Sequence, residues 1–316
     1  MLTIYQSDAQ GKLQTTHTIA HNTLLYMVNP TEQEILSTAK KLAVSEKFFR
    51  DSLDINERPR ISKDGSALLI VLNLPVVNDG KQLAEEIPYR TMPIGIIHAA
   101  NHLVIVTKEE VPLLPALFRG NYGSFQTHMK TRITLLLFEA IALSYGDYLT
   151  HVTKRVGKLQ QKLKVAYRNS ELFGMINLNK SLVCFSTSLS AMQIVFERLS
   201  KGRDIKLYEA DERMLHDALI DIEQAKEVTE MRRESLSNLM DAYAVIIHNN
   251  LNSVLKILTT LTIVLVIPTM FGSIFSMNVA LPYEFQWIST IVVWSLMVII
   301  SGILIYVFSK KKFLRI

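Results

Sequence analysis

The chain has 316 residues, of which 49% are hydrophobic and 20% are charged, and its 34 Lys and Arg against 29 Asp and Glu give a net charge of +5. This length suggests about two domains, and the hydrophobic content exceeds that of an ordinary soluble protein with as many charges. A single cysteine, Cys184, excludes intramolecular disulfides. The N-terminus from Met1 to Lys12 is polar, so we expect no signal peptide.

Residues 1–118 are predicted to form a cytoplasmic α/β domain. Ile35, Leu42 and Phe49 recur at helical spacing between Pro30 and Leu53, which predicts one or two short helices. Three apolar runs bounded by turn-forming residues predict strands at Ala67 to Val77 (before Asn78-Asp79-Gly80), at Pro93 to Ala99 and at His102 to Thr107.

Residues 119–250 are predicted to form long cytoplasmic helices and a stalk. No proline occurs between Ser124 and Leu251, and helix breaks are expected near Asn169 and Gly202. After Gly202 nothing interrupts a helix before Pro268, so the stalk should continue into the apolar segment that follows. Such a helix of about 60 residues would extend about 90 Å. Because a helix of that length is not stable alone, it implies packing against copies of itself.

Two of these helical segments carry opposite charge. The basic segment has no acid and contains Lys154, Arg155, Lys158, Lys162, Lys164 and Arg168. The segment from Asp204 to Glu234 holds ten acids against five Lys or Arg. Each segment is either a solvated helix face or part of a pair that packs through complementary charge, and the acidic segment is also a candidate for binding cations.

Two apolar segments near the C-terminus are predicted to span a membrane. Ile257 to Phe275 and Trp287 to Phe308 contain no charged residue, and about 20 apolar residues suffice to cross the hydrocarbon core. We assign residues 251–275 and 287–309 to the two spanning helices, residues 276–286 to a short extracellular loop, and residues 310–316 to a basic tail. Lys and Arg flank the spans but are absent from the loop, which predicts that both termini are cytoplasmic. The same placement explains the net positive charge without nucleic acid.

The first span carries a polar stripe. Steps of three and four residues along one helical face meet the following positions: Asn252, Leu255, Thr259, Thr262, Val266, Thr269 and Ser273. Polar groups at membrane depth must face protein or water. The stripe is therefore either a helix-packing face, with hydroxyls bonded to backbone carbonyls, or the wall of an aqueous pore. One helix cannot enclose a pore, so the second interpretation requires an oligomer.

The sequence shows no catalytic motif. It has no HExxH, no Gly-rich phosphate loop and no Cys/His cluster, and His17 and His21 have no further ligands nearby. We expect a protein that is not an enzyme and that uses no organic cofactor.

Several motifs, in order along the chain, resemble the CorA family of magnesium channels. They are Leu53-Asp-Ile-Asn-Glu-Arg-Pro-Arg-Ile61, Asn252-Ser-Val-Leu-Lys-Ile-Leu-Thr259, Ile267-Pro-Thr269, Ser276-Met-Asn-Val279, Leu281-Pro282 and Lys310-Lys-Lys-Phe-Leu314. The family reads Gly-Met-Asn where this chain has Ser276, Met277 and Asn278. The resemblance implies a funnel-shaped homopentamer with an N-terminal α/β domain, a long helical stalk and two C-terminal transmembrane helices in the plasma (inner) membrane.

The resemblance also implies roles for individual residues. Asn252, Thr269 and Asn278 would form polar rings in the pore, and Leu255, Leu258 and Val266 a hydrophobic constriction. The loop Ser276-Met277-Asn278 would select hydrated Mg²⁺, which gives up its waters reluctantly. Serine in place of glycine restricts this loop. A basic collar near the cytoplasmic mouth would consist of Lys256, Lys310, Lys311 and Lys312.

Members of the family sense cytoplasmic Mg²⁺ through carboxylates between subunits. Here Asp217 and Asp221, one helical turn apart, would form this regulatory site with Glu85 or Glu86. We therefore expect a divalent cation channel for Mg²⁺ uptake that is gated by cytoplasmic Mg²⁺. The alternatives are a ZntB-like transporter of Co²⁺, Ni²⁺ or Zn²⁺ and a membrane-tethered member that does not conduct.

Overall fold

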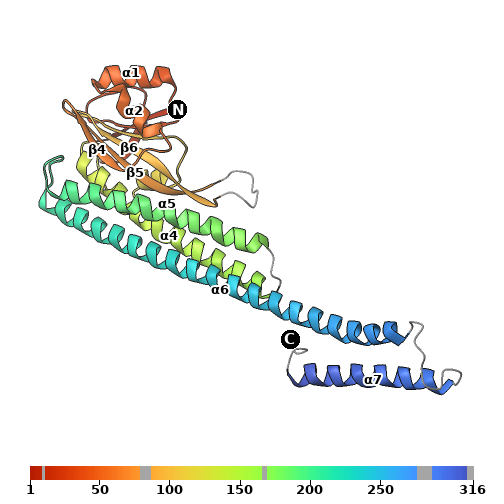
Figure 1. Ribbon diagram of the computed structural model, residues 1–316. Helices are drawn as coiled ribbons and strands as arrows, with labels where there is room; N and C mark the ends of the chain where they lie inside the picture. Colours follow the sequence, from red (N-terminus) through yellow and green to blue (C-terminus); the bar gives the residue numbers. More distant parts are fainter. Residues whose placement is uncertain (9–10, 79–86, 166–168, 276–286, 312–316) are drawn as a thin grey trace. The chain divides into compact units, whose positions relative to one another are not determined.

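The computed structural model describes residues 1–8, 11–78, 87–165, 169–275 and 287–311. The chain divides into two compact units, Met1–Asn238 and Leu239–Ile316. The first unit holds a β-sheet with short helices on one face and long helices on the other (Figure 1). The second unit holds the C-terminal part of the longest helix and one further helix.

The described residues form seven strands, which make one sheet in the order β2-β1-β3-β7-β6-β5-β4. Their bounds are β1 Leu2–Ser7, β2 Leu13–Thr16, β3 Leu24–Val28, β4 Arg60–Asp64, β5 Ala67–Val77, β6 Tyr89–His98 and β7 Leu103–Thr107. Only the central pair β3 and β7 is parallel. The predicted strand at Ala67–Val77 is confirmed, as are the other two within a few residues.

β6 begins at Tyr89, four residues before the predicted start. Pro93 therefore lies inside the strand, opposite Asn73 of β5. β7 pairs only with the part of β6 from Ile94 to His98. Pro93 is thus just beyond the end of β7, where β6 has a neighbour on one side only, and proline is tolerated at such an edge because it has no N–H to donate.

The helices α1 (Glu32–Leu42) and α2 (Glu46–Leu53) cover one face of the sheet, as the apolar spacing predicted. Ile35 and Phe49 are buried there against Leu69, Ile97 and further strand residues. The approach of α2 is close, because a Cβ added to Gly95 of β6 would overlap the Ser52 side chain. The segment from Leu53 to Ile61 continues from α2 into β4.

Arg60 joins the end of α2 to the start of β4. Its Nη2 lies 2.6 Å from Asp51 Oδ2 and its Nε 2.9 Å from Glu57 Oε1. The guanidinium is about a third exposed, so these bonds position the turn more than they stabilise the fold. This contact gives the Leu53 to Ile61 motif a structural role.

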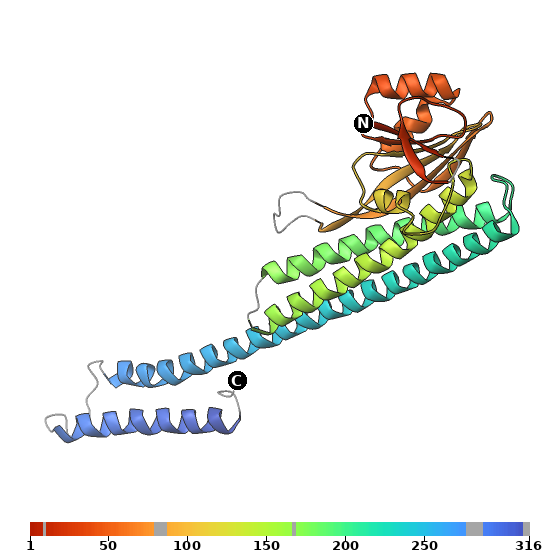
Figure 2. The same cartoon turned by 180° about the vertical axis from the view of Figure 1, so that it is seen from behind.

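Long helices cover the other face of the sheet (Figures 1 and 2). After the short α3 (Leu113–Phe118) come α4 (Lys130–Val165), α5 (Asn169–Ser200) and α6 (Glu209–Phe275). α5 begins at the predicted break near Asn169, and Gly202 lies with a positive φ in the turn before α6. The sheet is tied to these helices by hydrogen bonds from Tyr145 Oη to the Asn73 carbonyl (3.0 Å) and between His98 and Thr134 (2.9 Å).

Within the first unit, α6 packs through one apolar stripe. From Leu215 to Thr229 the buried positions follow alternating steps of three and four residues, and one more lies seven residues later: Leu215, Ala218, Ile222, Ala225, Thr229 and Leu236. Gln193 of α5 bonds both Glu223 and Lys226 of α6. α6 therefore belongs to the helical layer of the first unit over its first half.

α6 then continues without a break to Phe275, which confirms the prediction that the stalk helix runs on into the first apolar segment. α7 (Trp287–Lys310) follows in the second unit. Among the described residues, α4, α6 and α7 are each long and apolar enough to cross a membrane. The apolar stretch of α4 is 61% buried inside the protein, against 6% for α6 and 0% for α7. The apolar surface of α4 is therefore largely buried by the rest of the protein, whereas that of α6 and α7 is left exposed.

Candidate functional site

The predicted polar stripe is solvent-exposed along its whole length on α6. The exposed positions are Asn252, Leu255, Thr259, Thr262, Val266, Thr269 and Ser273. At 100° per residue they occupy a sector of about 100°. The same face extends toward the N-terminus to two exposed residues that the sequence analysis left out, His248 and Asp241. Continuing the same three-and-four step from Asn252 would have found both.

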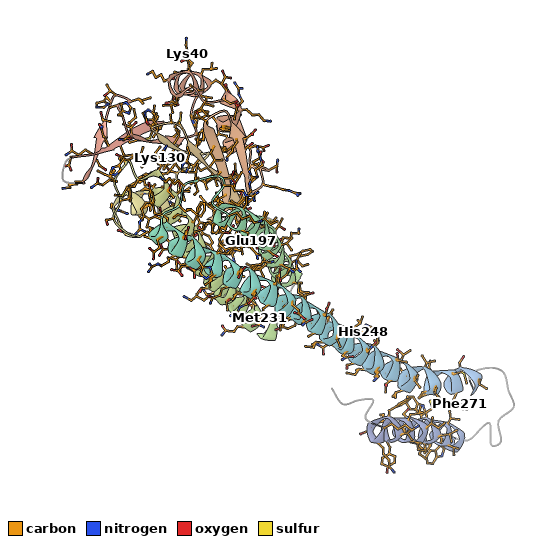
Figure 3. All side chains as sticks on the ribbon, turned by 90° about the vertical axis from the view of Figure 1, so that its left-hand side faces the viewer. Lys40, Lys130, Glu197, Met231, His248 and Phe271 are labelled. Atoms are coloured by element: carbon orange, nitrogen blue, oxygen red, sulfur yellow. The ribbon has the colours of Figure 1, made fainter. Side chains whose placement is uncertain are left out.

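The opposite face of α6 packs against α7. On this face Ile257, Val264 and Phe271 are partly buried, and Thr260 is only 2% exposed. Figure 3 shows Phe271 where α6 runs beside α7. A Cβ added to Gly272 would overlap Met297 of α7, so the two backbones approach closely at this point. The two faces are about 150° apart, which leaves the polar stripe turned away from α7.

Two threonines of the stripe bond the carbonyl one turn earlier. Thr262 Oγ1 donates to the Leu258 carbonyl at 2.9 Å, and Thr269 Oγ1 to the Leu265 carbonyl at 2.6 Å. Each hydroxyl has one proton, so its oxygen is left as an acceptor on the exposed face. Water molecules in the shell of a cation point their protons outward, and an acceptor oxygen is the group that receives them.

A shallow groove of about 410 Å³ lies on this face near the end of α6. Its lining residues are Leu265, Val266, Thr269, Met270, Ser273 and Ile274. Three of them belong to the polar stripe. The groove therefore combines hydroxyl oxygens with apolar walls.

The residues predicted to form a hydrophobic constriction are all exposed in the single chain. Leu255 is 48% exposed, Leu258 57% and Val266 54%. Large apolar side chains gathered on one helix face mark an interaction site or a membrane surface. Within the single chain these three side chains are not covered by other residues.

The predicted basic collar is exposed as well. Lys256 on α6 and Lys310 and Lys311 at the end of α7 are exposed, and none forms an ion pair within the described part of the chain. Lys312 lies outside the described residues, as do the loop residues Ser276, Met277 and Asn278. The roles assigned to these four residues stay predictions.

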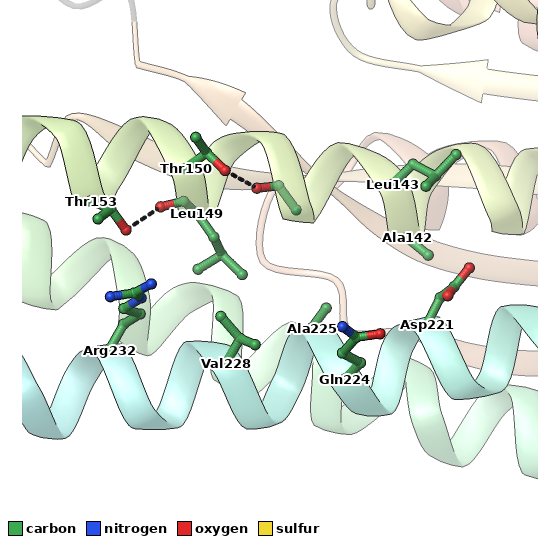
Figure 4. A pocket seen from close by; sticks show the side chains of 11 residues that line it. Ala142, Leu143, Leu149, Thr150, Thr153, Asp221, Gln224, Ala225, Val228 and Arg232 are labelled. Atoms are coloured by element: carbon green, nitrogen blue, oxygen red, sulfur yellow. Dashed lines mark hydrogen bonds between the residues drawn. The ribbon is translucent and has the colours of Figure 1, made fainter.

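The predicted regulatory carboxylates differ in their surroundings. Asp217 is exposed, whereas Asp221 is partly buried at a groove of about 270 Å³ between α4 and α6. Figure 4 shows Asp221 beside Ala142 of α4, with Arg232 at the other end of the groove. No group of three or more potential ligands occurs among the described residues. Glu85 and Glu86 lie outside them, so the pairing with Asp217 and Asp221 remains a prediction.

The chain is similar to proteins of one known family. Residues 23–312 match the family described as CorA-like Mg²⁺ transporter protein. The chain is 24% identical to the cobalt/magnesium transport protein CorA of Methanocaldococcus jannaschii, over 90% of this chain and 88% of that protein. It is 22% identical to the protein of the same name from Thermotoga maritima, over 84% and 76% of the two chains.

The fold has solved counterparts. The complete CorA magnesium transporter from M. jannaschii superposes with a TM-score of 0.85 at 22% identity, covering 98% of this chain and 97% of that one. The cytoplasmic domain of ZntB from Vibrio parahaemolyticus superposes with a TM-score of 0.61 at 13% identity, covering 78% and 97%. The predicted arrangement of an N-terminal α/β domain followed by a long helical stalk is confirmed by the first of these matches.

Proposed function

The chain belongs to the CorA-like Mg²⁺ transporter family of divalent cation channels, and we propose that it takes up Mg²⁺ through an oligomeric pore lined by α6. One observation carries this proposal. α6 presents a stripe of amide, hydroxyl and apolar side chains on the face turned away from α7. A membrane anchor alone has no need for such a stripe, and an aqueous path does.

The membrane topology follows from the two apolar helices. Residues 251–275 and 287–309 would span the plasma (inner) membrane, with residues 276–286 outside. The stalk, the α/β domain of residues 1–118 and the tail of residues 310–316 would lie in the cytoplasm. The exposed lysines at the ends of the spans and the loop without Lys or Arg support this orientation.

The pore requires several copies of the chain. We propose a homopentamer in which the α6 stripes face the axis and the α7 helices face lipid. The packing of α7 against the opposite side of α6 supports this arrangement, since it leaves the polar stripe free for the axis. We propose five subunits because the chain resembles a family whose members are pentamers.

Conduction would proceed by recognition of the hydrated ion. Mg²⁺ keeps several of its waters, and the acceptor oxygens of Thr262 and Thr269 would receive hydrogen bonds from those waters. Rings of Asn252 and Asn278 amides would act in the same way at the two ends. Between them Leu255, Leu258 and Val266 would close the path by excluding water when the ring is narrow.

Regulation by cytoplasmic Mg²⁺ is part of the proposal. Asp217 and Asp221, on the acidic stretch of α6, would bind Mg²⁺ together with Glu85 or Glu86 of a neighbouring copy. The exposure of Asp217 supports a site that opens toward another subunit. Mg²⁺ bound there would hold the stalks together and keep the pore closed.

Selectivity for a different metal is the second candidate. The observation behind it is Ser276, which replaces the glycine of the family motif next to Asn278. The similarity to two cobalt/magnesium transport proteins supports Mg²⁺ and Co²⁺ over a ZntB-like preference.

Metal uptake into proteoliposomes tests both candidates. We expect Mg²⁺ to enter vesicles containing the wild-type protein, as followed by a Mg²⁺-sensitive dye. Thr269→Val removes one acceptor oxygen at nearly constant volume and should lower the flux about tenfold, the effect expected when a charge-assisted hydrogen bond is lost. Thr260→Val makes the same change on the side facing α7 and should leave the flux unchanged. Wild-type vesicles that admit none of Mg²⁺, Co²⁺, Ni²⁺ and Zn²⁺ would rule out the channel.

A further inference from the structure

His248 continues the polar stripe of α6 beyond the predicted pore. It is exposed in the second unit, four residues before Asn252 (Figure 3). It precedes Val266 by 18 residues, which is five turns of an α-helix, so the two side chains leave the helix in the same direction. His248 therefore lies at the middle of the sector that the stripe occupies.

From this placement we propose that the His248 side chains of the oligomer form a binding site for divalent metals that prefer nitrogen ligands, at the cytoplasmic approach to the pore. The inference rests on the proposed function, because one chain supplies a single imidazole and neighbouring copies complete the site. The metals it would bind are Zn²⁺, Ni²⁺ and Co²⁺.

Ligand chemistry separates these metals from the main cargo. Neutral imidazole is a good ligand for Zn²⁺ and Ni²⁺, whereas Mg²⁺ is held by oxygen atoms and keeps its water shell. A Zn²⁺ ion at the ring would exchange one or more of its waters for imidazole nitrogens from two or more copies. Mg²⁺ would pass the ring hydrated. The His248 ring would thus retain Zn²⁺ and make it a blocker of the Mg²⁺ path.

The charged groups on either side of His248 are one carboxylate and three lysines. The carboxylate of Asp241 lies two turns earlier on the same face of α6. Lys256 lies about two turns later and is turned about 80° away. α7 runs antiparallel to α6, and Gly272 of α6 contacts Met297 of α7. Counting 13 residues along both helices from this contact places Lys310 at the level of Thr259. Lys310 and Lys311 therefore lie about three helical turns from His248, on its C-terminal side. No described residue of α7 reaches the histidine.

The experiment measures Zn²⁺ binding and Zn²⁺ block on the full-length protein. Zn²⁺ is titrated into the purified oligomer by calorimetry, and its inhibition of Mg²⁺ flux is measured in proteoliposomes. We expect His248→Ala to weaken both by about tenfold or more, as for the loss of a metal ligand. His216→Ala, which removes the other exposed histidine of α6, should change neither.

The outcomes separate this inference from the proposed function. Equal Zn²⁺ affinity in wild type and His248→Ala would overturn the inference, whatever the flux. Binding that depends on His248 in a protein without Mg²⁺ flux would support the metal site and refute the channel. Zn²⁺ block that survives His248→Ala while Mg²⁺ flux is normal would refute the role of His248 and leave the channel intact.

Discussion

Gly272 of α6 lies directly against Met297 of α7, so close that a Cβ on the glycine would overlap the terminal methyl group of the methionine. Small residues allow membrane helices to approach in this way. Gly272 lies about 110° around the helix from the middle of the polar stripe, so the contact places α7 away from the stripe.

A large side chain at Gly272 should therefore loosen the helix pair. Gly272→Leu is expected to destabilise it by about 1–3 kcal/mol, as in other overpacked sites, and to lower the melting temperature of the detergent-purified protein. Gly272→Ala should have little effect, because the flexible end of Met297 can move aside. Combining Gly272→Leu with Met297→Ala should restore the melting temperature, and a failure of this rescue would contradict the contact.

Asp204 offers a test in the first unit. Its carboxylate is 6% exposed and bonds Arg198 Nε and Lys63 Nζ, each at 2.9 Å, which joins β4 to the turn before α6. These partners lower the pKa of Asp204. Asp204→Asn should destabilise the protein by about 1–3 kcal/mol at pH 7, at the low end for a paired buried charge because both partners are half-exposed.

The sign of the pH dependence is fixed by that lowered pKa. The stabilisation is present above the unfolded pKa of about 3.9 and is lost as the pH falls through the still lower folded pKa. The difference between wild type and Asp204→Asn in chemical unfolding should therefore be constant from about pH 5 to about pH 8 and shrink below about pH 4. A difference that grew on acidification would contradict the ion pairs.

Elements of the fold can be predicted from the sequence when they depend on residues close together in the chain, and not when they depend on contacts between distant segments. β5 and the helices follow from local apolar periodicity and were predictable. β1 to β4 were not, because β2 and β4 are short and largely polar, and β3 pairs in parallel with a strand about 80 residues later. The local sequence of residues 24–28 does not indicate that β3 pairs with β7.

The candidate site was more predictable than the sheet. A helix fixes which residues share a face, so the stripe from Asn252 to Ser273 follows from spacing alone. The side on which α7 packs does not, because it depends on the tertiary contact of Gly272. The surroundings of the two carboxylates were not predictable for a related reason. Spacing puts Asp217 and Asp221 one turn apart, but only packing makes Asp221 face α4 while Asp217 stays exposed.

His98 predicts a second pH effect of different origin. Its ring is buried at the end of β6, bonds Thr134 at 2.9 Å and lies near Lys130, and burial lowers its pKa to about 3. Between about pH 3 and about pH 6.5 the unfolded chain binds one more proton than the folded chain, so stability falls on acidification by up to about 1.4 kcal/mol per pH unit.

A His98→Gln variant lacks this titration. Between about pH 7.5 and about pH 5.5 we expect wild type to lose about 1.4 kcal/mol more unfolding free energy than the variant, as followed by far-UV circular dichroism in urea. Parallel pH profiles for the two proteins would show that the imidazole is not held neutral.

The regulatory proposal predicts a change in protease resistance. Millimolar Mg²⁺ should slow trypsin cleavage of the first unit in the wild-type protein, and Asp217→Ala should weaken that protection because it would remove one of the proposed Mg²⁺ ligands. Glu212→Gln, a charge loss at another exposed position of α6, serves as the control. An unchanged Mg²⁺ dependence in Asp217→Ala would exclude Asp217 as a sensor.

The central claim is that the stripe on α6 lines an aqueous path for Mg²⁺. Thiol modification during Mg²⁺ flux tests it most directly, in a Cys184→Ser background that has no other cysteine. Thr259→Cys lies on the stripe, and Leu261→Cys, two residues later, is 52% exposed on the opposite side. We expect a charged thiol reagent to block flux through Thr259→Cys and to leave Leu261→Cys unaffected. Equal block of both variants, or of neither, would contradict the account.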